Sequence, residues 1–158
     1  MIRKRIAAYG RDILRNKHYR ELKKYTQHGS VSLMQHSLRV AETSLRISDL
    51  IKKLHINVHE KELVRGALLH DYFLYDWHDK PITLKKGLFA MHGFTHPLTA
   101  LKNARADFAL TPREQDIIVK HMFPLTLTRI PACMEAWIVT IADKYCSLVE
   151  TFSMRNAS

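Results

Sequence analysis

The chain has 158 residues, of which 46% are hydrophobic and 25% are charged, and its formal net charge is +10. This length suits one compact domain that buries roughly 70% of its unfolded-state surface, and it disfavours a second domain. No apolar run is long enough to cross a membrane, and two isolated cysteines cannot form a disulfide framework, so we expect a protein of the reducing cytoplasm.

Composition predicts an all-α fold of about six or seven helices, because Gly and Pro are few (five each) and helix-forming residues are abundant. Residues 1–25 are strongly basic, and Ile6, Ile13 and Leu22 recur among the cations at helical spacing. We predict one amphipathic helix here with a solvated basic face. A nucleic-acid-binding arm and an Arg-rich transit peptide are the alternatives, although Asp12 interrupts the acid-poor pattern of a transit peptide.

The next two predicted helices follow capping signals. Ser32-Leu33-Met34-Gln35 has the form of a capping box, so a helix should begin there and run to about Leu54. A second helix should begin near Asn57, with Glu60 as the capping residue three positions later. It leads directly into His70-Asp71 at its end.

Periodicity is lost over residues 76–95, which we interpret as a long loop of the kind that often carries function. A helix should resume at His96-Pro97, where proline suits the first helical position, and continue to about Phe108. Thr111-Pro112-Arg113-Glu114 combines an N-cap, a first-turn proline and a capping glutamate, which predicts a helix to about His121.

The last predicted helix, at about residues 133–152, is the most apolar, yet it carries Asp143 in its middle. An ionised carboxylate on an apolar face is costly unless it is paired, hydrogen-bonded or bound to a metal. His70 raises the same question, because Leu63 and Ala67 lie beside it on its helix. Each residue taken singly fits a hydrogen-bonded core group, but together with histidines early in two other segments they favour a metal site.

Three motifs, in their order and helical context, resemble the HD-domain metal-dependent phosphohydrolase superfamily. They are Gln35-His36-Ser37-Leu38-Arg39-Val40-Ala41, Leu68-Leu69-His70-Asp71 and Ile141-Ala142-Asp143-Lys144. The resemblance covers residues 32–150 and implies a single HD-type domain over 1–158, with the basic segment outside the motif region. It also implies that His36, His70, Asp71 and Asp143 bind one divalent ion.

His96 and His121 resemble the histidines that add a second ion in the binuclear branch of this superfamily, where Asp71 would bridge the two ions. Alternatively, these two histidines bind substrate phosphate. Met122 stands where the cyclic-dinucleotide branch has another histidine, and no Gly-Tyr-Pro occurs, so hydrolysis of cyclic dinucleotides is disfavoured.

The implied activity is hydrolysis of a small phosphate ester, such as a nucleotide, by attack of metal-bound hydroxide on phosphorus. The ligand set suits one or two ions of Mn, Fe, Ni, Co or Zn, with Mg a further option. The alternative is a non-catalytic sensor or interaction module that retains the metal. We expect no membrane partner, we rank nucleic acid last among partners, and we leave the oligomeric state open.

Further site residues are predicted around these ligands. Lys144, directly after a ligand, is the candidate phosphate contact, with a surface lysine as the alternative. His92 is a candidate acid for the leaving group, and His78, Trp77 and Arg39 are candidate substrate contacts. The alternatives are exposed loop histidines, a tryptophan that packs the loop, and a local salt bridge of Arg39.

Overall fold

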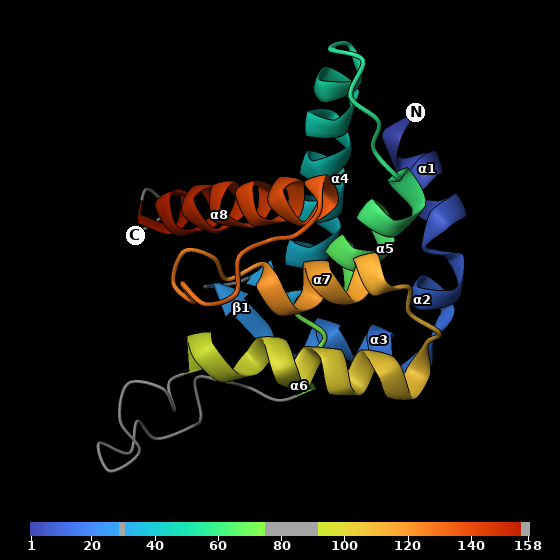
Figure 1. The fold of residues 1–158 in the computed structure, drawn as a ribbon. Coiled ribbons are helices and arrows are strands. Elements are labelled where there is room, and N and C mark those ends of the chain that lie inside the picture. The colour runs from blue at the N-terminus through green and yellow to red at the C-terminus, as the bar shows by residue number, and fades with distance from the viewer. Residues whose placement is uncertain (29–30, 75–91, 156–158) are drawn as a thin grey trace.

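The computed structural model describes residues 1–28, 31–74 and 92–155, and within them the chain is almost entirely helical (Figure 1). This confirms the all-α prediction, although the described part contains eight α-helices rather than six or seven. The α-helices are α1 (Ile2–Tyr9), α2 (Arg11–Arg15), α3 (Lys17–Glu21), α4 (Leu33–Lys52), α5 (Glu60–Leu69), α6 (His92–Asp107), α7 (Pro112–Lys120) and α8 (Met134–Arg155).

A short 3-10 helix, η1 (Leu22–Lys24), and a small antiparallel hairpin separate α3 from α4. The hairpin pairs β1 (Thr26–His28) with β2 (Val31–Ser32), and its register is irregular. These strands were not predicted, because they are too short to show an alternating pattern.

The basic N-terminal segment folds as three short helices, so the prediction of one helix over residues 1–25 was wrong. Gly10 ends α1 where the chain passes close to α5, and a Cβ at this position would lie 2.4 Å from Leu68 Cδ1. Asn16 then begins α3, because its side chain accepts hydrogen bonds from the backbone N–H groups of His18 and Tyr19. Two local breaks therefore divide the segment.

The same segment is part of the core rather than a solvated appendage. Its buried apolar side chains are Ile6, Ile13, Tyr19 and Leu22. Arg65 of α5 also ties it to the rest of the domain, with Nη1 2.6 Å from Asp12 Oδ1 and Nε 2.6 Å from Oε1 of Glu114 in α7. The exposed cations lie on the outer face of these helices.

The two complete capping boxes are confirmed at α4 and α7. The hydroxyl of Ser32 accepts from the backbone N–H of Gln35, whose side chain accepts from the Ser32 N–H. Thr111 and Glu114 make the same reciprocal pair at α7. Local chemistry is sufficient to fix these two helix starts.

Two other helix starts differ from the prediction. The helix expected near Asn57 begins at Glu60, because its N-cap is His59, whose backbone N–H donates to Glu135 Oε1 of α8 at 2.7 Å. α6 begins at His92 instead of His96, so Pro97 lies inside the helix rather than at its first position. A proline beyond the first turn of a helix removes one backbone hydrogen bond, and its ring crowds the carbonyl group four residues earlier.

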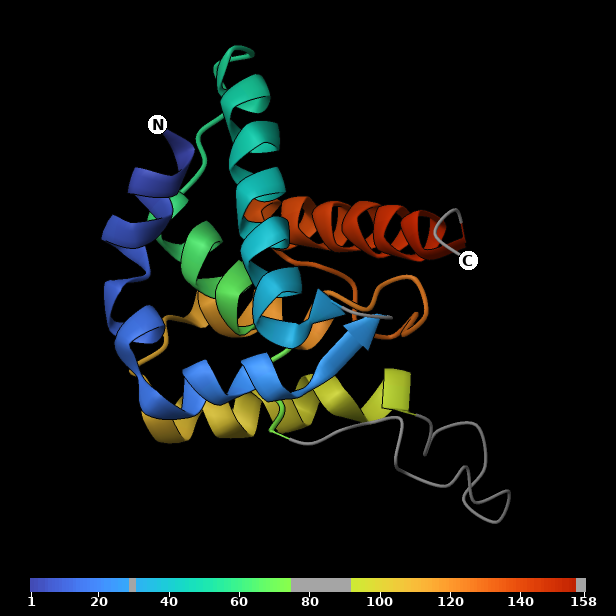
Figure 2. The same ribbon diagram turned by 180° about the vertical axis from the view of Figure 1, so that it is seen from behind.

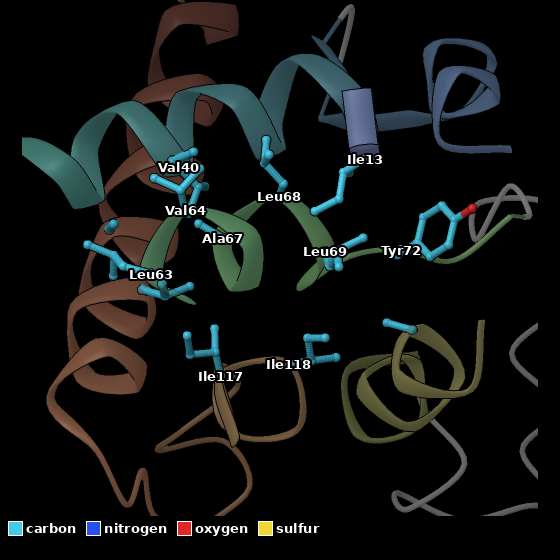
Figure 3. Close-up of a cluster of buried hydrophobic side chains, with 14 of the residues drawn as sticks. Ile13, Val40, Leu63, Val64, Ala67, Leu68, Leu69, Tyr72, Ile117 and Ile118 are labelled. Carbon is cyan, nitrogen blue, oxygen red and sulfur yellow. The ribbon is translucent and has the colours of Figure 1, made fainter. Parts of the chain in front are cut away.

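α5 occupies the middle of the core, between α4 and α7 (Figures 1 and 2). Figure 3 shows Val64 and Leu68 of α5 toward α4, with Ile117 and Ile118 of α7 on the opposite side. α8 packs across α4, α5 and α7, and α6 packs along α7. The end of α5, which carries His70-Asp71, is therefore surrounded by the other long helices.

In the parts of the chain described, no helix combines the length and apolarity that crossing a membrane requires.

Candidate metal centre

The six residues predicted as metal ligands are all buried and lie together. They form two groups, and within each group one nitrogen or oxygen of every residue lies within 4.8 Å of the others. The first group is His36, His70 and Asp143, and the second is Asp71, His96 and His121.

Five helices deliver these side chains to one place. Two of the residues are the C-caps at which helices end, so their rings extend from the last turn of each helix into the space beyond it. The positions are His36 in the first turns of α4, His70 and Asp71 at the end of α5, His96 in α6, His121 at the end of α7, and Asp143 in the middle of α8.

Asp71 stands between the two groups. Its Oδ1 lies 3.2 Å from His96 Nε2 and 3.4 Å from His121 Nε2. Its Oδ2 lies 3.4 Å from His70 Nε2 and 3.9 Å from His36 Nε2. The two oxygens of one carboxylate therefore face different groups, as a carboxylate that bridges two ions must.

Backbone carbonyls orient two of the rings. His70 Nδ1 donates to the carbonyl oxygen of Ala67, and His121 Nδ1 donates to that of Ile118, both at 2.8 Å. These bonds hold the proton on Nδ1 and direct Nε2 toward the carboxylates. Metal-ligating histidines are held in the same way, with the second ring nitrogen donating to a fixed acceptor.

A buried carboxylate orients the third ring. His36 Nδ1 donates to Glu150 Oε2 at 2.9 Å, and Arg39 Nη1 donates to Glu150 Oε1 at 3.1 Å. Sequence reasoning missed Glu150. A signal was present, because Glu150 follows Asp143 by seven residues and so lies on the same face of α8. Arg39 contacts Glu150, and its role toward substrate stays a prediction.

Neighbouring carboxylates raise the pKa values of the two histidines in the first group, His36 and His70. Burial lowers the pKa of His36, but hydrogen bonds to Asp143 and Glu150 outweigh it and raise this pKa to about 9. Burial likewise opposes protonation of His70, but the charge of Asp71 and a hydrogen bond to Asp143 raise its pKa to about 10. Metal binding must displace these protons.

The second group differs in its protonation. Burial lowers the pKa of His121 to about 4, although Asp71 acts in the opposite direction. Burial also opposes ionisation of Asp71, yet the charge of His70 and the neighbouring rings hold its pKa well below the usual range. A neutral imidazole and an ionised carboxylate are the forms that bind metal.

The donor set fits a divalent transition metal. His70 Nε2 is buried and lies 3.4 Å from Asp71 Oδ2 and 3.6 Å from Asp143 Oδ1. Asp71 Oδ1 is buried as well and lies 3.2 Å from His96 Nε2 and 3.4 Å from His121 Nε2. Both atoms face the centre. Four imidazoles and two carboxylates are ligands typical of Mn, Fe, Co, Ni or Zn rather than calcium.

Lys144 lies at the edge of the centre. Its Nζ donates to Asp143 Oδ2 and to the carbonyl oxygen of His121, both at 3.0 Å. Its side chain is 39% exposed, so the ammonium group is fixed beside the ligands and also reaches solvent. Contact with a substrate phosphate stays a prediction.

The remaining predicted site residues belong to the segment before α6 and to its first residue. Trp77 and His78 lie outside the described residues, and the side chain of His92 does too, although its backbone begins α6. In contrast, sequence reasoning missed Gln27 of β1, whose Nε2 donates to Asp71 Oδ2 at 2.9 Å. No sequence signal marks Gln27, because it lies outside every motif.

Comparison with known families matches residues 33–148 to the HD domain. This range is well over half of the chain and contains all six candidate ligands. Comparisons with curated proteins and with solved structures give no match.

Proposed function

The chain belongs to the HD domain family, whose members are generally metal-dependent phosphohydrolases, and we propose that it hydrolyses a small phosphate ester such as a nucleotide. The observation that carries the proposal is the placement of Asp71 between two buried groups of ligands. A structural metal needs one closed ligand set, whereas two adjacent sets that share a carboxylate are typical of hydrolytic centres.

We assign one ion to His36, His70, Asp143 and Asp71, and a second to His96, His121 and Asp71. When bound, such ions polarise a phosphoryl oxygen and make water a stronger nucleophile. The protein positions these ions through rings that are themselves held by Ala67 and Ile118 carbonyls.

The cations near the centre favour an anionic substrate. Lys144 places an ammonium group beside Asp143 with part of its surface in solvent, where it can neutralise charge on a phosphoryl group. The net charge of +10 raises the local concentration of phosphate esters and nucleotides in general. These features support a phosphorylated small molecule as substrate.

The test is turnover by the full chain after removal of metal and reloading with Mn(II). A phosphomonoester reporter, a phosphodiester reporter and a panel of nucleotides should include a substrate that is cleaved only by the reloaded protein. Asp71→Ala should lose this activity. Asp49→Ala is the matched control and should retain it, because the Asp49 carboxylate pairs with Arg5, 2.9 Å away, instead of with the ligands.

The alternative function is a metal-binding sensor or interaction module without catalysis. It makes the opposite prediction in the same assay, namely metal uptake by the wild-type chain without cleavage of any compound in the panel. That result would reject the hydrolase proposal.

We also propose a cytoplasmic location, which the two free thiols Cys133 and Cys146 support.

A further inference from the structure

Gln27 reaches the metal centre from β1, a strand that precedes the residues matched to the HD domain family. β1 packs against α4 and α8, and from there the Gln27 amide donates to Asp71 Oδ2 at 2.9 Å. We propose that Gln27 is a positioning residue, which holds the Asp71 carboxylate in the rotation that lets it bridge two ions. This inference rests on the proposed function.

The orientation of the amide follows from the chemistry of its partner. An ionised carboxylate only accepts hydrogen bonds, so the nitrogen of Gln27 must face Asp71. The other amide atom, Oε1, is buried and has no hydrogen-bond partner in the described part of the chain. The hydrogen bond to Asp71 is thus the one interaction that this amide makes there, and it contributes to the centre rather than to the hairpin.

The bond acts on one oxygen and leaves the other available. Asp71 Oδ1 faces the second group, at 3.2 Å from His96 Nε2 and 3.4 Å from His121 Nε2. A carboxylate oxygen has two lone pairs, so Oδ2 can accept from Gln27 and still bind an ion. The hydrogen bond to Gln27 restricts rotation of the carboxylate group and so keeps Oδ1 directed toward the second group.

The two ions should depend on this restraint unequally. The first group has a carboxylate of its own, Asp143, whereas Asp71 is the one carboxylate that the described part of the chain groups with His96 and His121. If the Asp71 carboxylate is free to rotate, the first ion keeps the carboxylate of Asp143 as a ligand. The second ion then loses the Asp71 carboxylate, which is the anionic ligand of its group. Loss of the Gln27 amide should therefore weaken mainly one of the two ions.

The experiment is titration of the metal-free full chain with Mn(II), followed by electron paramagnetic resonance. Two Mn(II) ions that share a carboxylate give a coupled spectrum. Gln27→Met keeps the side-chain length but has no N–H donor. We expect this variant to bind one ion as tightly as the wild type and the other roughly 10–100-fold more weakly, with the coupled signal appearing only at higher Mn(II).

Thr26→Val is the matched control, because it alters the same strand without removing the amide. Thr26→Val should bind both ions like the wild type. If Thr26→Val also bound one ion more weakly, the effect would belong to the hairpin as a whole, and the role of Gln27 would be overturned. Equal affinities for both ions in Gln27→Met and wild type would overturn it as well, while leaving the proposed function intact. A wild-type chain that binds fewer than two ions would instead reject the two-ion centre, and this inference with it.

Discussion

Glu150 acts on the centre through a single residue, because its Oε2 accepts from His36 Nδ1 while Arg39 binds its other oxygen. Such partners of a ligating histidine fix the ring and increase its basicity. We predict that Glu150→Ala lowers the affinity for the first ion roughly 10–100-fold. Glu150→Gln should lower it less, because an amide oxygen can still accept from His36.

Competition between a metal-binding dye and the protein would measure both affinities. Glu42→Gln is the control, since Glu42 pairs with Arg46 on the surface of α4 and should bind metal like the wild type. Equal affinity in Glu150→Ala and wild type would show that the buried carboxylate does not support the metal.

Two of the candidate ligands could be recognised from burial cost alone, because a carboxylate or imidazole on an apolar helix face is unfavourable, and the other four followed from the resemblance to the HD-domain superfamily. Asp143 in an apolar helix and His70 beside Leu63 and Ala67 stand out for this reason. Gln27 and Glu150 do not stand out, because a polar residue near the start or end of a domain ordinarily lies in solvent. Their roles depend on the folding of distant segments against Asp71 and His36, which no local pattern encodes.

At the scale of the elements, α5 and α7 pack closely against each other at Gly66. A Cβ on Gly66 would lie 2.4 to 2.9 Å from three side-chain atoms of Ile117. We predict that Gly66→Ala lowers the free energy of unfolding by about 1–3 kcal/mol, because the two helices must separate or Ile117 must leave its preferred rotamer.

Chemical denaturation would measure this loss, with a double-mutant cycle as the check. In the Gly66→Ala background, Ile117→Ala removes two of the three clashing atoms and should cost less than it does in the wild type. Strict additivity of the two changes would contradict the close contact.

The docking of α1 should depend on pH. Arg5 donates to Asp49 of α4 at 2.9 Å and also pairs with Glu60 of α5. The hydrogen bond from Arg5 lowers the pKa of Asp49. Burial raises the pKa of Glu60, but hydrogen bonds from Lys52 and Arg5 outweigh burial, so the pKa of Glu60 is lowered as well. A carboxylate whose pKa is lower in the folded than in the unfolded chain stabilises the folded state at any pH above its unfolded-state pKa. This stabilisation is lost as the pH falls through the lower, folded-state pKa.

The free energy of unfolding of the wild type should therefore exceed that of Arg5→Gln by about 1 kcal/mol at neutral pH. The difference should shrink below the ordinary carboxylate pKa values of 3.8 and 4.5. A difference that stays constant down to pH 3 would show that Arg5 contributes through packing and not through its charge.

Helix starts marked by a complete capping box were predicted well, at Ser32 and at Thr111. Boundaries set by other elements were not. α5 starts at Glu60 because a glutamate of α8 binds the backbone before it. The basic segment breaks at Gly10 because α5 lies against it. These contacts exist only once the domain has folded.

At the scale of the whole molecule, the centre concentrates buried polar groups at the junction of five helices. Four imidazoles and two carboxylates lie there, all less than 10% exposed. Burying such groups opposes folding unless they are paired or bound to an ion. The stability of the domain should therefore be coupled to metal binding, because the unfolded chain has no preformed site.

We predict that removing the metal with a chelator destabilises the wild-type chain. At a free metal concentration 100-fold above the dissociation constant, binding contributes about 2.7 kcal/mol, which corresponds to a fall of roughly 5–10 °C in Tm for a domain of this size. Differential scanning calorimetry with and without Mn(II) would measure the shift. Asp71→Ala should show little or no shift, because it removes the one ligand that both groups share, whereas Asp49→Ala should shift like the wild type. An equal shift in Asp71→Ala would mean that the stabilising metal binds elsewhere on the chain.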